Sequence, residues 1–427
     1  MNVEGLWGIS GLEWPVDKEL MDKAKRETLT SRELLALKSA SFYGPIQLLE
    51  LARGANEKSK EFYVRICYDV LRELDECEDA SSKALTKDDK IWAIDKLSLV
   101  VENIVRRDPN GNSGKLEAII RGDDLKSLTD RIVRGAVDEK ARIFIEQFGK
   151  GIVLRDICRI GKEDEVGKEI KLALDYCVKS MALGMRAFLD KGPLQTPRQL
   201  DDYCYHVAGK IGSGFLNKLV KLKDIVNEKP VELDDELAEQ FGRYLQLINI
   251  AKNIRSDYAE SRRFLPEEWR SRGISYEVMM EDYNSLNAGK VREEVFNRLV
   301  LDFVGDRFSR SISYVKYVPL ELSGFKAFCL VPLITGQKTI ENMIDAGADK
   351  VFKGEEDAIK ISYGIGTIMN FSYYLSTYNN GANVNGWLEE FRKNPRGFSF
   401  KPDDYITWAP NWIGIERDVI KMHLGIS

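Results

Sequence analysis

The stretch YDVLRELDECED, residues 68–79, is the most informative in the chain because it combines helical apolar spacing with a cluster of acids. Asp75, Glu78 and Asp79 stand at i, i+3 and i+4, so a helix places their carboxylates on one face. Like charges at these spacings repel, and a Mg²⁺ ion, which prefers oxygen ligands, removes the repulsion. Arg72, on a neighbouring face upstream, could reach diphosphate oxygens. The segment is therefore either a metal-binding face or a solvated acidic helix end.

A second polar helix is predicted at QLINIAKNIRSDY, residues 246–258. Gln246, Asn249, Asn253 and Asp257 fall on one stripe among apolar residues. Buried polar groups need partners, which an interhelical hydrogen-bond network or a metal with its waters and a phosphate would supply. Two such faces on opposing helices would form a cage for a metal-bound diphosphate.

Composition limits the class of protein. The chain has 427 residues, 44% hydrophobic and 31% charged, with a net charge of −5, which is typical of a globular protein. The absence of a basic stripe argues against a nucleic-acid partner. Six cysteines without a CxxC pair and only two histidines argue against a zinc site and for a reducing compartment.

No segment resembles a signal peptide or a membrane span. The longest apolar stretch, near Cys329, is interrupted by Lys326 and Pro332 and is shorter than the roughly 20 residues that cross a bilayer. We therefore expect a cytoplasmic protein without a transmembrane segment, and peripheral membrane association stays open.

Helical periodicity dominates the chain, and strand-like alternation is rare. Short loops between the periodic segments favour antiparallel neighbours in one bundle. We expect an all-α protein with a single large helical domain over residues 1–378. Asn379-Asn380-Gly381 reads as a break, and residues 379–427 are expected to be an irregular extension packed on the domain through tryptophans: Trp387, Trp408 and Trp412.

Six segments, in order, resemble motifs of the squalene/phytoene synthase family. The two acidic segments are similar to its two acidic motifs, and Ser39-Ala40-Ser41-Phe42 is similar to its SxSF motif. Three more resemble the squalene synthase branch: residues 203–209 (YCYHVAG), 328–332 (FCLVP) and 350–355 (KVFKGE). The resemblance runs from about residue 31 to 378, and it implies the class I isoprenoid synthase fold.

The resemblance also implies an activity: a Mg²⁺-dependent prenyltransferase that ionises an allylic C10–C20 prenyl diphosphate and condenses two of them head to head. It assigns three sets of site residues: Tyr203, Tyr68 and Arg72 as catalytic; Ser39, Ser41, Phe42, Gln246, Asn249, Lys252, Arg263 and Phe328 as substrate-binding; and Asp75, Glu78, Asp79, Asn253 and Asp257 as metal-binding. Lys350 and Lys353 match the region that binds NADPH in squalene synthases, and equally suit surface charge. The oligomeric state stays open.

Departures from the family pattern keep other hypotheses open. Asn253 and Ser256 replace acids of the second motif, and Ala40 replaces the basic residue of SxSF. A site with fewer charges would suit transfer of one prenyl group to a different acceptor, or cyclisation. A non-catalytic relative is the third hypothesis. The GxxGxG pattern at Gly209, Gly212 and Gly214 is no dinucleotide loop, because no strand precedes it; a lipid channel or close helix packing explains it better.

Overall fold

The computed structural model describes most of the chain, and every regular element in the described part is a helix. The described residues are 15–38, 45–46, 49, 57–107, 113–160, 165–221, 233–270, 273–319, 322–359, 372 and 382–394. The predicted all-α fold is confirmed. None of the described helices is long and apolar enough to cross a membrane.

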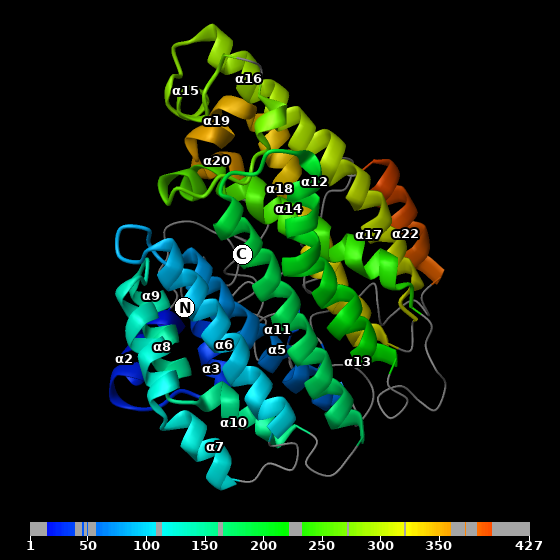
Figure 1. Ribbon diagram of the computed structural model, residues 1–427. Coiled ribbons are helices and arrows are strands. Elements are labelled where there is room, and N and C mark those ends of the chain that lie inside the picture. The colour runs from blue at the N-terminus through cyan, green and yellow to red at the C-terminus, as the bar shows by residue number, and fades with distance from the viewer. Residues whose placement is uncertain are drawn as a thin grey trace.

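The first half of the chain forms a group of helices around α5, α6 and α11, which lie side by side (Figure 1). Their apolar faces meet in one continuous core. The helices of this half are α2 Pro15–Arg26, α3 Ser31–Lys38, α5 Glu57–Asp79, α6 Lys87–Arg107, α7 Ser113–Ile120, α8 Asp123–Arg134, α9 Glu139–Gly149, α10 Ile152–Arg159 and α11 Glu165–Lys191.

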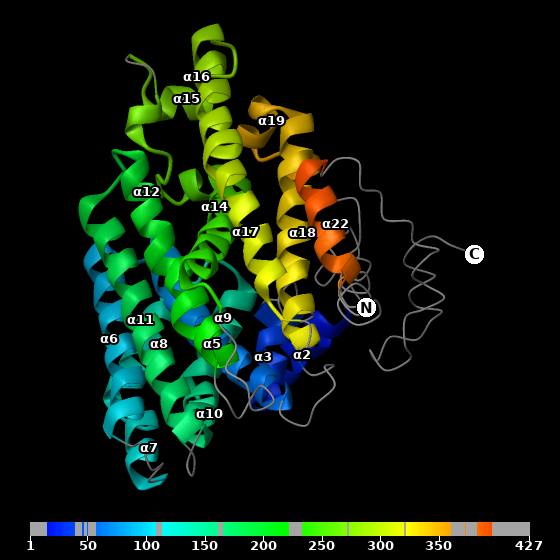
Figure 2. The same ribbon diagram turned by 90° about the vertical axis from the view of Figure 1, so that its right-hand side faces the viewer.

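The second half is built on α14, which packs against α17 and α18 (Figure 2). Its helices are α12 Pro197–Cys204, α13 Asn217–Lys221, α14 Asp235–Ala259, α15 Tyr276–Glu281, α16 Leu286–Asn297, α17 Gly305–Tyr317, α18 Ser323–Ala346, α19 Ala348–Lys353, α20 Glu356–Ile359 and α22 Ala382–Lys393. Three π-helical segments, η1 Tyr205–Gly209, η2 Gly212–Leu216 and η5 Arg298–Val304, and the 3₁₀ turn η4 Glu267–Trp269 complete it.

Glycines let α14 cross η1 and η2 with backbone in contact. A Cβ on Gly212 would lie 2.2 Å from the carbonyl oxygen of Ala238, and one on Gly242 would lie 2.3 Å from that of Ala208. No side chain fits at those distances. Close helix packing therefore explains this part of the GxxGxG pattern, and it fixes α14 relative to the helix that carries Tyr203.

The segment after residue 379 differs in part from our expectation. We expected irregular backbone, but Ala382–Lys393 is helical and docks on α17. Leu388 and Phe391 are fully buried, and the Phe391 ring meets Phe308 edge-on at 5.5 Å. Trp387 stacks on Phe391, whereas Trp408 and Trp412 lie outside the described residues. The domain boundary at residue 378 stays a prediction.

Candidate active site

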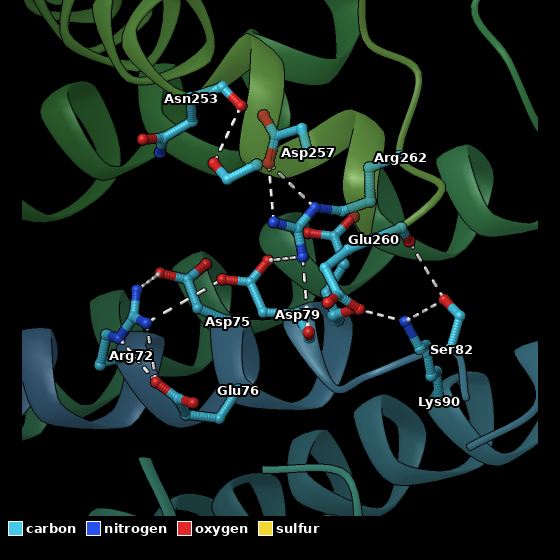
Figure 3. Close-up of polar contacts among 12 residues, drawn as sticks. Arg72, Asp75, Glu76, Asp79, Ser82, Lys90, Asn253, Asp257, Glu260 and Arg262 are labelled. Atoms are coloured by element: carbon cyan, nitrogen blue, oxygen red, sulfur yellow. Dashed lines mark hydrogen bonds and ion pairs between the residues drawn. The ribbon is translucent and has the colours of Figure 1, made fainter. Parts of the chain in front are cut away.

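The first acidic motif lies at the carboxyl end of α5, where negative charge is unfavourable. Basic side chains supply the compensation (Figure 3). Arg72 Nη1 lies 3.1 Å from Asp75 Oδ2, and its Nη2 lies 2.7 Å from Glu76 Oε1. Lys38 Nζ also reaches Glu76 Oε1, at 2.8 Å. Burial, with the nearby Asp79 and Glu76 carboxylates, raises the pKa of Asp75 to about 7 in spite of Arg72. Tyr68 lies half-buried one turn before Arg72.

Glu78 accepts a hydrogen bond from the hydroxyl of Tyr203. Tyr203 Oη donates to Glu78 Oε2 at 2.9 Å, while Glu78 Oε1 is buried and has no hydrogen-bond partner among the described residues. Burial and the Asp79 carboxylate raise the pKa of Glu78 to about 8. Burial and then Glu78 raise the pKa of Tyr203 well above its usual value. A capping box between Thr196 and Gln199, with Pro at the first turn, starts the helix that presents Tyr203.

An arginine joins the two acidic motifs. Arg262 Nη1 lies 2.9 Å from Asp79 Oδ1 on α5, and its Nη2 lies 2.7 Å from Asp257 Oδ1 on α14 (Figure 3). Burial raises the pKa of Asp257 to about 6, against the opposing effect of Arg262. The two motifs predicted to face each other therefore meet on one guanidinium.

The backbone after α14 aims Arg262 at this place. Ser261 has φ of 63°, a left-handed conformation that non-glycine residues rarely adopt. The turn brings the Arg262 amide to within 2.7 Å of the Asp257 carbonyl oxygen, which it donates to. Ser82 donates to the Glu260 carbonyl at 3.2 Å and ties the turn to the loop after α5.

The predicted polar stripe of α14 is accessible to solvent in part: Gln246 is half-buried and Asn249 is exposed, whereas Asp257 is buried. Lys252, beside the stripe, is exposed. The side chains of Gln246, Asn249 and Lys252 make no hydrogen bond or ion pair with the part of the chain that the structure describes. Desolvation by the surrounding protein, and then the charge of Arg72 on α5, lower the pKa of Lys252. An exposed ammonium near a second cation suits an anionic ligand between the helices.

The substituted positions of the second motif lie on the same helix. Ser256 Oγ donates to the Asn253 carbonyl at 3.0 Å, so this hydroxyl is engaged with its own backbone. Asn253 is half-buried, and its side-chain amide lies on the α14 side of the site (Figure 3). Of the three motif positions, only Asp257 offers a carboxylate.

Other predicted site residues are not joined to this arrangement by the contacts of the described residues. Arg263, which we assigned to substrate, pairs with Glu277 and lies over the Tyr276 ring at 5.3 Å, and its role stays a prediction. Phe328 is buried in α18 beside Phe325, with ring centroids 6.0 Å apart. Its role as a cavity wall stays a prediction. Ser39, Ser41 and Phe42 lie outside the described residues.

Sequence reasoning missed three groups near the site. It assigned a role to Arg263 and none to Arg262, although a guanidinium close in sequence to Asp257 was the available signal. It also missed the aromatic neighbours of Tyr203: Phe188 and Phe264 stack at 4.4 Å, and each contacts the Tyr203 ring, at 5.3 and 4.9 Å.

The third missed group is on the opposite face of α5. Asp69 and Glu73 are 0% and 1% exposed, and both oxygens of Asp69 and Oε2 of Glu73 have no hydrogen-bond partner among the described residues. Burial raises the pKa of both carboxyls well above the usual value. Nothing in the i, i+4 spacing distinguishes these acids from solvated ones.

The donors fit a metal that shares its coordination with a ligand. Within the described residues, no three acid, histidine or cysteine side chains are already grouped to hold an ion. However, Arg262 contacts Asp79 and Asp257 through their Oδ1 atoms, while Asp79 Oδ2 lies 3.9 Å from Arg72 Nη2 and Asp257 Oδ2 is outside these contacts. Mg²⁺ commonly takes one or two carboxylates and completes its octahedron with phosphate and water. Asp75, Asp79 and Asp257 suit that arrangement.

The lysines matched to an NADPH-binding region are engaged with protein. Lys350 Nζ lies 3.7 Å from Asp357 and 4.0 Å from Glu355, and Lys353 Nζ lies 4.9 Å from the centre of the Tyr283 ring. Their charges are partly balanced, so these contacts give no support to a phosphate site.

Comparisons with known proteins find similar sequences and a similar fold. The family model described as squalene/phytoene synthase matches residues 164–362. Squalene synthase R6 of Phoma sp. is 33% identical over 134 residues, which are 31% of this chain and 30% of that protein. Squalene synthase of Mus musculus is 27% identical over 219 residues, 50% of this chain and 48% of that protein. The matches thus span 30% and 48% of the lengths of these two curated relatives.

Solved structures give the same fold. TcSQS in complex with the ligand BPH1237 has a TM-score of 0.57 at 18% identity, over 95% of this chain and 99% of that one. TcSQS with the ligand E5700 has a TM-score of 0.55 at 20% identity, with the same coverage. These structures show that the chain has the same all-α fold. Within that fold, residues 164–362 are similar to the squalene/phytoene synthase family.

Proposed function

We propose that this chain is a Mg²⁺-dependent prenyltransferase that ionises an allylic prenyl diphosphate and condenses two of them head to head. The observation that carries the proposal is the meeting of Asp79 and Asp257 on one guanidinium. The two carboxylates come from helices distant in sequence, so their convergence is a property of the fold. Similarity to this family supports the same reaction class.

Asp75, Asp79 and Asp257 would hold the metal. When bound, Mg²⁺ neutralises the charge that develops on the leaving diphosphate as the allylic C–O bond breaks. Lys252 and Arg72 flank the same space, and charge-assisted hydrogen bonds from them would bind diphosphate oxygens. Gln246 and Asn249 extend this polar surface along α14.

Tyr203 and its neighbours suit the reacting carbon. Glu78 accepts from the Tyr203 hydroxyl and so fixes its direction beside the acidic motif. Phe188 and Phe264 give the same place two aromatic faces, which attract an allylic cation and exclude water. We propose that Tyr203 contacts the cation and that these rings protect it from hydrolysis.

Product analysis tests the proposal. Purified protein is incubated with farnesyl or geranylgeranyl diphosphate and Mg²⁺, with and without NADPH, and the extract is analysed by mass spectrometry. A C30 or C40 hydrocarbon or cyclopropyl diphosphate is expected, and it should disappear in Asp79→Asn and Asp257→Asn. The NADPH arm decides whether reduction follows condensation. No condensed product with any C10–C20 diphosphate contradicts the proposal.

A second candidate is transfer of one prenyl group to a different acceptor, or cyclisation. Ser256 favours it, because its hydroxyl is bonded to the Asn253 carbonyl and the second motif keeps only one carboxylate. A site for one diphosphate needs fewer charges. Diphosphate release without a self-condensed product supports this candidate, and diphosphate binding without release indicates a non-catalytic relative.

Cytoplasmic location and peripheral membrane contact stay proposals that cell fractionation tests.

A further inference from the structure

Arg262 occupies the position that a bridging cation would take between the acidic motifs. Three nitrogens of one guanidinium are engaged: Nη1 lies 2.9 Å from Asp79, and Nη2 and Nε lie 2.7 and 3.1 Å from Asp257. Nη1 also lies 3.4 Å from the Asp79 carbonyl oxygen. The Arg262 side chain is only 15% exposed. The guanidinium is planar and rigid, so it presents its nitrogens to the two carboxylates in a fixed geometry that a flexible lysine ammonium does not provide.

The local backbone is built to hold the arginine there. The left-handed Ser261 is, in the described part of the chain, the one non-glycine residue with positive φ, and it directly precedes Arg262. Such conformations carry strain and persist where the surroundings enforce them. The hydrogen bonds of the turn to the Asp257 carbonyl and to Ser82 do so here. The contact is therefore part of the fold and differs from a chance surface ion pair.

The remaining acids of the site also have partners within the chain. Arg72 pairs with Asp75 and Glu76, and Tyr203 holds Glu78. A divalent ion arriving alone meets carboxylates that already have partners, and it is repelled by a guanidinium that shares two of them. A metal that arrives with diphosphate brings an anion to which the displaced guanidinium can bind.

We infer that Arg262 is a positioning residue that bridges the two acidic motifs before ligand binding, and that metal and diphosphate displace it together. It follows that Mg²⁺ alone binds weakly and that diphosphate strongly increases its affinity. This inference adds a role for Arg262 to the proposed function, and it rests on that function only in taking diphosphate as the ligand. Because coupling between two sites is reciprocal, Mg²⁺ must increase the affinity for diphosphate by the same factor.

Calorimetry on the full chain tests this without turnover. Wild-type protein is titrated with MgCl₂ alone, with inorganic pyrophosphate alone, and with MgCl₂ in the presence of pyrophosphate. Pyrophosphate is expected to raise the Mg²⁺ affinity by at least about tenfold. In Arg262→Gln, the affinity for Mg²⁺ alone should rise by roughly tenfold, and the coupling to pyrophosphate should fall towards none. Arg262→Lys should lie between the two.

The control is Arg255→Gln. Arg255 lies on α14 and pairs with Glu281 at 3.1 Å, so this variant removes the same charge without touching Asp79 or Asp257. It should titrate like wild type. Thermal melts provide a second readout: Mg²⁺ alone should raise the melting temperature of Arg262→Gln more than that of wild type, and Arg262→Lys gives the comparison if the glutamine variant folds poorly.

The inference is overturned if Mg²⁺ and pyrophosphate bind wild type independently or not at all. It is equally overturned if Arg262→Gln has the wild-type affinity for Mg²⁺ alone, or if Arg255→Gln changes that affinity as much. If Mg²⁺ and pyrophosphate bind cooperatively but no condensed product forms, the role of Arg262 is supported and the proposed reaction is contradicted. If condensed product forms but the two ligands bind independently, the proposed reaction is supported and the role of Arg262 is contradicted.

Discussion

Replacing Asp69 by asparagine should stabilise the protein in a strongly pH-dependent way. The side chain is 0% exposed, and neither carboxylate oxygen has a hydrogen-bond partner in the part of the chain that the structure describes. Desolvation is the largest influence on its pKa, and Asp156 and Glu61 add to the rise while Arg65 opposes it. A buried carboxyl in these surroundings is held in its neutral form.

The size of this stabilisation follows from the difference in proton binding at Asp69 between the folded and the unfolded chain. In the unfolded chain an aspartate loses its proton near pH 3.9, as a rough average. Above that pH the folded chain binds more protons at Asp69 than the unfolded chain does, so the free energy of unfolding falls by about 1.4 kcal/mol per pH unit until the buried group titrates. At pH 7 the loss reaches at most about 4 kcal/mol. An asparagine does not titrate and avoids it.

Urea denaturation at pH 5, 6 and 7 measures the effect for wild type, Asp69→Asn and the exposed control Asp130→Asn. The difference in free energy of unfolding between Asp69→Asn and wild type should grow by about 3 kcal/mol from pH 5 to pH 7, in favour of the variant. The control should show no such trend. A difference that stays constant with pH would refute the reasoning, because it would mean that Asp69 is ionised in the folded protein.

Three further changes probe the site and its support. Tyr203→Phe should lower the rate of product formation by roughly 100-fold, a usual value for losing one positioned proton-bearing group, and steady-state kinetics showing less than a threefold fall would contradict its role. Asn253→Asp adds a carboxylate one turn before Asp257. It should raise the Mg²⁺ affinity, measured by titration with pyrophosphate present, by roughly tenfold or about 1.4 kcal/mol. An unchanged affinity would mean that this side chain does not face the metal. Gly242→Val places side-chain atoms where a Cβ would already lie 2.3 Å from the Ala208 carbonyl oxygen, so the free energy of unfolding in urea should fall by about 3 kcal/mol, and an unchanged midpoint would exclude the close helix crossing.

Part of the site could be predicted because helical spacing is itself geometric information. The i, i+3, i+4 pattern places Asp75, Glu78 and Asp79 near one face, and the polar residues of α14 recur with the same period. Arg262 could not be assigned in this way, because it lies beyond the end of α14 in a turn with no periodicity. Its direction depends on the conformation of Ser261, which local sequence does not favour.

The sequence by itself determined that this is a helical protein with two acid-bearing helices, since periodicity and residue type act over a few turns. Only the tertiary structure decided which groups those acids meet. In the folded protein Glu78 is hydrogen-bonded to Tyr203, and Asp79 and Asp257 form ion pairs with the same arginine, Arg262. Asp69 is buried and has no hydrogen-bond partner among the described residues. Pairing and burial depend on segments distant in sequence, and the pattern of one helix carries no information about them.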